Sequence, residues 1–140
     1  MKNAWILLLV ASAMGCGNPV SNLESSFDGT IGAVCESCPL AFGEATTEAC
    51  LARTPALLPD ETWDCLEDNY AMYSSELDPF WSCWNQAYDR YDRCVRDLLV
   101  PCPTAEGIQV CNDQFEAARD ACPNPTDVEA AVGLGACFTD

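Results

Sequence analysis

Apolar residues recur three or four positions apart through much of the chain, which is the spacing of one helical face. The clearest series follows Asp78, a favourable N-cap residue, and Pro79, which suits the first helical position. It runs through Phe80, Trp84, Ala87, Tyr88, Tyr91, Cys94, Val95 and Leu98. Because Val100 precedes Pro101, we expect this helix to end there.

Four shorter segments have the same periodicity, and Pro or Gly residues separate them. They cover residues 44–53, 60–74, 104–121 and 126–133. Thr104 is the expected cap of the third, and Thr126 with Glu129 forms a capping box for the last, which we expect to end at Gly133. No two-residue alternation persists, so the pattern predicts an all-α, disulfide-rich domain of about four to five short helices.

The N-terminus has the features of an export signal. Lys2 provides a positive charge, and an apolar run follows over residues 4–11. This run is shorter than the ~20 residues that a membrane-spanning helix needs. We therefore expect residues 1–15 to be a cleaved signal peptide.

The segment Ala13-Met14-Gly15-Cys16 resembles the lipobox of bacterial lipoproteins, and the resemblance covers only the signal and its cleavage site. It implies that Cys16 becomes a lipidated N-terminus carrying diacylglycerol and an amide-linked chain such as palmitate. Two or three acyl chains suffice for stable membrane anchoring. Gly17, rather than Asp, follows the cysteine, which in Gram-negative sorting implies the outer membrane or cell surface. The alternative is an ordinary signal peptide with Cys16 in a disulfide.

Residues 16–34 are rich in Gly, Ser and Asn. Their apolar residues (Val20, Leu23, Phe27 and Ile31) are too sparse to define a helical face. We expect a flexible tether over residues 16–34, followed by a folded domain over residues 35–140.

The chain contains 11 cysteines, a number typical of a disulfide scaffold in an oxidising compartment. Ten remain if Cys16 carries lipid: Cys35, Cys38, Cys50, Cys65, Cys83, Cys94, Cys102, Cys111, Cys122 and Cys137. Ten is an even number, so all of them can pair.

Two cysteine pairs have a spacing that fits a helical hairpin. Cys83 and Cys94 are 11 residues apart, as are Cys111 and Cys122, which places each pair within about 20° on one helical face. If the two helices are antiparallel, Cys94 faces Cys111 and Cys83 faces Cys122. The other six cysteines allow about 15 pairings, and the sequence does not choose among them. Residues 79–122 resemble the twin Cys-x9-Cys helical hairpins, which implies a scaffold geometry but no function.

The chain is strongly acidic, with 22 Asp and Glu against 6 Lys and Arg. Without the signal it keeps five Arg, for a formal charge of −17. This argues against binding to nucleic acid or anionic lipid. A solvated acidic surface is the simpler interpretation of the charge. The alternative is an acidic cation-binding protein that uses the seven acids between Asp60 and Asp78, although that segment lacks the pattern of an EF-hand.

Few residues suggest catalysis. The chain has no His, which removes His-based catalytic and metal sites, and it has no Gly-rich phosphate loop. Cys35-Glu36-Ser37-Cys38 gives an alternative as a thiol–disulfide redox pair, but Glu36 would raise a neighbouring thiol pKa. We therefore predict scaffold cysteines, with no enzyme activity, cofactor or metal.

Aromatic residues gather between Trp63 and Tyr91. Trp81 lies one position off the predicted apolar face, so we expect it to be exposed and to form a binding surface with Tyr70 and Tyr73. The sequence therefore predicts a lipid-anchored, non-catalytic binding or structural module of the cell envelope. We expect its partners to be the membrane, through the N-terminal lipid, and an envelope protein or glycan.

Overall fold

The computed structural model describes residues 17–53 and 58–139, and all regular structure in these ranges is helical. The elements are α1 (Pro19–Ser37), the 3-10 helix η1 (Pro39–Phe42), α2 (Thr47–Arg53), α3 (Asp60–Met72), α4 (Ser74–Asp97), α5 (Ala105–Asp120) and α6 (Val128–Ala136). The predicted all-α class is confirmed, although α1 and α4 are long, with 19 and 24 residues. The predicted signal peptide and lipidated Cys16 lie outside the described residues.

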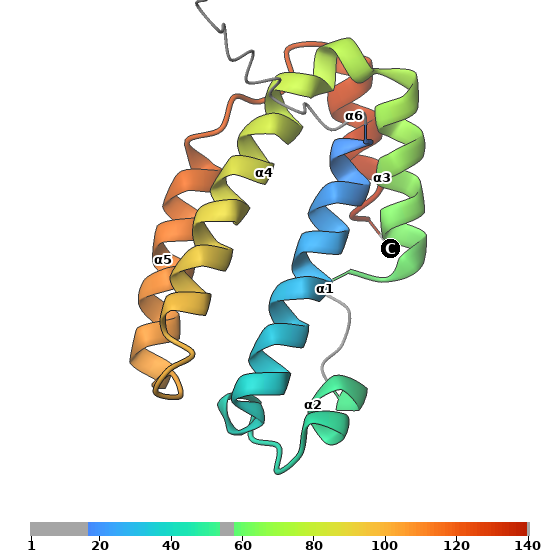
Figure 1. Cartoon of the computed structure of the whole chain (residues 1–140). Helices are drawn as coiled ribbons and strands as arrows, with labels where there is room; N and C mark the ends of the chain where they lie inside the picture. Colours follow the sequence, from blue (N-terminus) through green and yellow to red (C-terminus); the bar gives the residue numbers. More distant parts are fainter. Residues whose placement is uncertain (1–16, 54–57, 140) are drawn as a thin grey trace, which may run out of the picture.

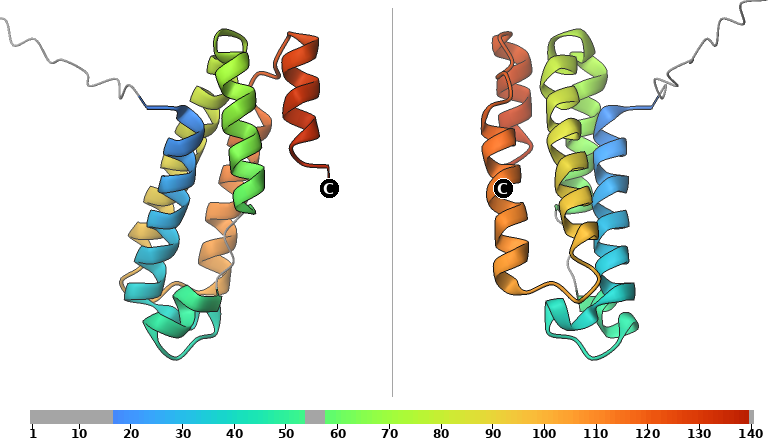
Figure 2. Two further views of the ribbon diagram at one scale, coloured as in Figure 1. Left: turned by 90° about the vertical axis from the view of Figure 1, so that its right-hand side faces the viewer. Right: turned by 60° about the vertical axis from the view of Figure 1, so that its left-hand side comes forward.

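The helices form an elongated bundle around α1 and α4, which run side by side in the same direction (Figures 1 and 2). On one side α5 lies antiparallel to α4, and on the other side α3 lies antiparallel to α1. The short α6 contacts α3, while α2 and η1 cover the end of the bundle where α1 finishes (Figure 1). The beginnings of α1, α4 and α6 therefore share the opposite end.

The prediction of a flexible tether is wrong from Pro19 onward, because these residues form α1. Asn18 caps the helix by accepting a hydrogen bond from the Val20 backbone N–H at 2.9 Å, and Pro19 is the first helical residue. The buried side chains of α1 are Val20, Leu23, Thr30, Val34 and Cys35. With the partly buried Phe27, the first four of them follow a spacing of three and four residues, as in the seam of a coiled coil, and Cys35 lies next to this seam.

The opposing seam on α4 has steps of four and seven residues, which return to the same helical face. Leu77, Trp81, Tyr88 and Val95 are buried, and the ring centroids of Phe27 and Tyr88 lie 4.0 Å apart across the two helices. The stabilisation of α1 therefore comes from this long-range seam, which outweighs the low helix propensity of Gly29 and Gly32.

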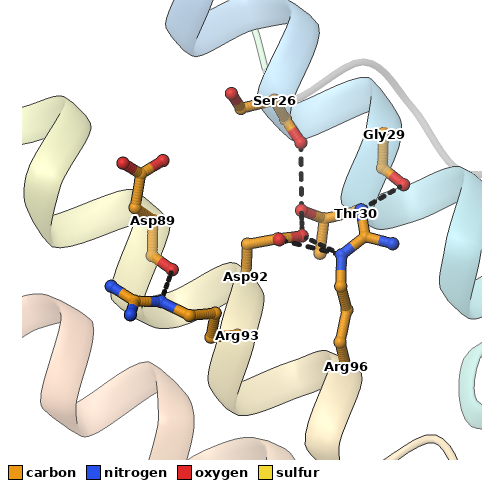
Figure 3. Close-up of polar contacts among 7 residues, drawn as sticks. All are labelled: Ser26, Gly29, Thr30, Asp89, Asp92, Arg93 and Arg96. Atoms are coloured by element: carbon orange, nitrogen blue, oxygen red, sulfur yellow. Dashed lines mark hydrogen bonds and ion pairs between the residues drawn. The ribbon is translucent and has the colours of Figure 1, made fainter. Parts of the chain in front are cut away.

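One polar cluster crosses the seam (Figure 3). The Thr30 hydroxyl lies 2.5 Å from Asp92 Oδ1, and Arg96 Nε donates to both Asp92 carboxylate oxygens at 2.8 Å. Arg96 also donates to the Gly29 carbonyl at 3.3 Å. Burial acts to raise the pKa of Asp92, but the hydrogen bonds from Arg96 and Thr30 outweigh burial and hold the pKa below its usual value. The cluster therefore fixes the register of α1 on α4.

Two acid–base pairs stand four residues apart on α4, Asp89 with Arg93 and Asp92 with Arg96, and the second of these forms an ion pair at 2.8 Å. Arg93 instead donates from Nε to the Asp89 backbone carbonyl at 3.1 Å (Figure 3).

Five disulfides hold the helices together: Cys35–Cys50, Cys38–Cys102, Cys65–Cys137, Cys83–Cys122 and Cys94–Cys111. The last two are the pairs that the spacing of 11 predicts, and each has a Cα–Cα distance of 5.7 Å. Cys35–Cys50 joins α1 to α2, and Cys65–Cys137 joins α3 to the residue after α6. Each of the helices α1 to α5 therefore contains at least one bridged cysteine, while η1 is directly preceded by one and α6 is directly followed by one.

Two predicted helix limits are wrong. The helix expected to begin at Asp78 starts one turn earlier, at Ser74, and Pro79 lies inside it. Pro79 is the sixth residue of α4 and lies beyond its first turn; because proline has no backbone N–H, the Ser75 carbonyl accepts no i+4 hydrogen bond from it. Leu77 is fully buried, and its packing explains why the helix includes this extra turn.

The last helix also differs from its prediction. Asp127 caps it in place of Thr126, by accepting from the Ala130 backbone N–H at 2.9 Å. Gly133 lies inside α6, where a Cβ atom would come within 2.1 Å of Asn69 Nδ2 on α3. The glycine therefore allows close approach of the two helices and does not end α6.

Candidate binding groove

Trp81, which we expect to be exposed, is buried, with only 2% of its surface accessible. Because α4 lies between α1 and α5, more of its circumference is covered than a single apolar stripe suggests. The Trp81 ring packs against Phe80 and Trp84, at centroid distances of 5.1 and 6.1 Å. Trp81 is thus a core residue, and the predicted aromatic surface does not form around it.

The other two residues of that predicted surface, Tyr70 and Tyr73, are half-buried and have different surroundings. Tyr73 packs against the core between α3 and α4. Tyr70 also touches the core, but its hydroxyl donates to Asp78 Oδ1 at 2.6 Å at the edge of a groove. Of the three predicted binding residues, Tyr70 lines this groove, and Trp81 and Tyr73 do not.

This groove, of about 760 Å³, is open to solvent and lies at the end of the bundle where α1 begins. Amides, hydroxyls and carboxylates dominate its lining. The lining residues are Gly17, which precedes α1, Pro19, Asn22 and Ser26 from α1, Tyr70 from α3, and Asp78, Pro79, Ser82, Asn85, Gln86 and Asp89 from α4. We call it the α1–α4 groove.

Hydrogen bonds hold the floor of the α1–α4 groove in place. The Asn85 side-chain amide donates to the Pro19 carbonyl and to the Trp81 carbonyl, each at 2.9 Å. It therefore ties the first turn of α1 to the middle of α4. A ligand of this groove meets a surface that is already ordered, which lowers the entropy cost of binding.

The groove is electrostatically negative. Its lining includes the carboxylates of Asp78 and Asp89 and no basic side chain. The neighbouring α1–α3 surface is also acidic: burial, followed by the charges of Glu67 and Asp28, raises the pKa of Glu24. Such a field disfavours anionic ligands, whereas the amides and hydroxyls can donate and accept hydrogen bonds with a neutral ligand.

The bond between Tyr70 and Asp78 predicts a measurable titration. It raises the pKa of Tyr70 to about 12, with smaller contributions from burial and from the Asp78 charge. Because the folded pKa lies above the unfolded one, this contact stabilises the fold fully below about pH 10. The stabilisation is lost as the pH rises toward 12. We expect NMR of ring-labelled tyrosine to show Asp78→Ala shifting the Tyr70 pKa back toward about 10. An unchanged Tyr70 pKa in this variant would show that the hydrogen bond does not form.

The structure does not join the two cysteines of the possible redox pair to each other. Cys35 bonds to Cys50, and Cys38 bonds to Cys102. The interpretation of Cys35-x-x-Cys38 as a redox disulfide is therefore wrong for this fold, and both residues serve as scaffold cysteines. Within residues 17–53 and 58–139, no three Asp, Glu or Cys side chains are grouped so that they could hold a metal ion.

Apart from Tyr70, the residues of the α1–α4 groove were not predicted from the sequence, because the predicted binding surface was based on aromatic side chains. A signal is nevertheless present in α4, where Ser82, Asn85 and Asp89 stand three and four positions apart and form a polar line beside the apolar seam. The facing residues Asn22 and Ser26 lie four apart on α1. Their role becomes visible only once residues 19–37 are known to be helical.

None of the helices in the described ranges is both long and apolar enough to cross a bilayer. No protein-family model matches the chain, no curated protein matches its sequence, and no solved structure matches its fold.

Proposed function

We propose that this chain is a lipid-anchored, non-catalytic binding protein of the cell envelope, and that the α1–α4 groove holds a neutral, hydroxyl-rich ligand such as a glycan. The observation that carries the proposal is a preordered groove lined by Asn, Gln, Ser and Tyr side chains. These groups hydrogen-bond to sugar hydroxyl and acetamido groups, and the Tyr70 ring offers a face for stacking on a sugar.

The position of the groove supports an envelope ligand. Only Gly17 and Asn18 separate the lipobox cysteine from α1, and two residues span at most about 7 Å. A lipid on Cys16 would therefore hold the groove close to the membrane surface rather than on a long tether. The intact mass of the membrane-extracted protein tests the anchor: a lipidated wild type and an unlipidated Cys16→Ser variant are expected.

The chemistry of the groove favours holding a ligand over converting it. Asp78 already accepts the hydrogen bond from Tyr70. The ten cysteines after Cys16 are all in disulfides, so the described domain presents no thiol nucleophile. The groove thus offers hydrogen-bonding partners and the carboxylate of Asp89, but no thiol.

Ligand binding is testable with a neutral N-acetylhexosamine tetramer as the probe, monitored by amide NMR shifts. We expect the shifts to cluster on residues 19–26 and 82–89, and we expect Gln86→Ala to weaken binding by roughly tenfold, equivalent to about 1.4 kcal/mol. Gln114→Ala is the matched control, because Gln114 is also exposed and also lies three residues after a helical cysteine, but on α5. Equal effects of both variants, or no shifts, would favour the alternative of a purely structural module.

A further inference from the structure

A second hollow, of about 520 Å³, lies between α3 and α6 on a surface separate from the α1–α4 groove. Its floor consists of Asn69, Gly133 and the Cys65–Cys137 disulfide, which are buried or half-buried. Its rim consists of exposed side chains, namely Glu61, Asp64, Asp68 and Met72. We call it the α3–α6 hollow.

The floor contains an unsatisfied acceptor. Asn69 is 3% exposed, and its side-chain carbonyl oxygen Oδ1 has no hydrogen-bond donor. A buried polar atom without a partner costs about 1–3 kcal/mol, and most such atoms in folded proteins are paired. The close approach of α6 at Gly133 holds this amide in place. The Asn69 carbonyl is therefore an unpartnered acceptor in a residue that lines the hollow.

The carboxylates of the rim favour a positively charged hydrogen-bond donor as the ligand of this hollow. Glu61, Asp64 and Asp68 lie three and four positions apart along one face of α3, and the lining contains no basic side chain. Carboxylates accept hydrogen bonds and attract positive charge. These three carboxylates do not form a metal-binding group. The disulfide and Met72 add an apolar, polarisable wall, which suits an alkyl chain more than a hydrated ion.

We propose that the α3–α6 hollow binds an alkylammonium group. The ammonium lies among the rim carboxylates and donates to the Asn69 carbonyl, and its methylene chain packs against the Cys65–Cys137 disulfide and Met72. A lysine side chain of a partner peptide and a free diamine share this chemistry. The proposal does not depend on a ligand in the α1–α4 groove.

Calorimetric titration of the disulfide-intact protein tests the proposal. The two probes are 1,5-diaminopentane and Nα-acetyl-lysine amide, whose side-chain ammonium is free. We expect saturable binding of one probe molecule per chain. The double variant Asp64→Asn/Asp68→Asn should weaken it at least about tenfold. Its matched control is Asp113→Asn/Glu116→Gln, which removes two exposed charges from α5 and should leave the affinity unchanged.

Asn69→Leu is the decisive variant, because it removes the unsatisfied carbonyl and keeps the side chain near its original size. Binding should fall at least about tenfold, while circular dichroism confirms that the helices remain.

Unchanged binding in Asn69→Leu would overturn the proposal. An equal loss of binding in the α5 control would also overturn it, because it would indicate a diffuse counterion effect. Displacement of the diamine by equimolar calcium chloride would also overturn it, in favour of a metal site. Binding of the lysine amide as well as the diamine would assign the site to a peptide, and binding of the diamine alone would assign it to a free polyamine.

Discussion

Reduction of the five disulfides is expected to unfold this domain under conditions in which the oxidised protein is fully helical. Each bridge closes a loop of between 15 and 72 residues, and loops of this size contribute roughly 3–4.5 kcal/mol each. A typical domain has a net stability of only about 5–15 kcal/mol. Even if the five contributions are not fully additive, the free energy lost on reducing all five bridges exceeds this net stability. Far-UV circular dichroism in a phosphine reductant checks this, and native helicity with ten alkylated thiols would contradict it.

Two double variants separate the contribution of loop length from that of local geometry. Cys65–Cys137 closes a loop of 72 residues and Cys35–Cys50 a loop of 15, yet their Cα–Cα distances are nearly equal, at 5.6 and 5.5 Å. Removal of the first pair by alanine substitution should therefore cost about 1.4 kcal/mol more than removal of the second. Cys65–Cys137 is also the covalent link between α6 and α3. Hydrogen exchange in α6 should accelerate more than elsewhere in that variant.

The sequence predicted those parts of the fold that depend on local contacts. The helix α5 has a capping threonine, whose Oγ1 accepts from the Gly107 N–H at 3.1 Å, and an apolar series within one segment. The bridges Cys83–Cys122 and Cys94–Cys111 follow from helix geometry, because 11 residues bring a side chain back to nearly the same face.

The parts that could not be predicted depend on partners far away in the sequence. Residues 19–37 have weak local preference for a helix, since Gly29, Gly32 and several Ser and Asn residues disfavour one. Their seam includes the polar Thr30, which hides the coiled-coil spacing until Asp92 is seen to accept its hydrogen bond. Only the packing against α4, some 60 residues away, decides the structure.

The binding site was unpredictable for the same reason. The α1–α4 groove joins residues 17–26 to residues 78–89, so it exists only if α1 is a helix parallel to α4. The α3–α6 hollow similarly requires Gly133 to lie inside α6, where the sequence indicates a helix end. The compositional features that were visible, acidity and aromatic clustering, describe the surface and the core without locating either concavity.

Trp81→Ala is expected to lower the free energy of unfolding by about 3–5 kcal/mol, the usual cost of removing a large aromatic side chain from a core. Trp81 is 2% exposed, and it packs against Phe80 and Trp84 in the largest buried cluster, so the cavity left behind cannot be filled by solvent-exposed groups. Had Trp81 been the exposed anchor of a binding surface, the same substitution would change stability by no more than about 0.5 kcal/mol. Urea denaturation monitored by circular dichroism distinguishes these outcomes.

Two further variants are compared with Trp81→Ala: Trp81→Phe as the conservative replacement and Val128→Ala as an exposed control. The Trp81 indole N–H is buried without an acceptor, so replacement by phenylalanine removes an unsatisfied donor while keeping most of the ring. We expect Trp81→Phe to cost much less than Trp81→Ala, because the lost packing is partly offset by this removal. Val128 is 74% exposed on α6, and its truncation should change stability by less than about 0.5 kcal/mol. Equal losses for the two Trp81 variants would show that the indole ring, rather than its buried volume, determines stability at this position.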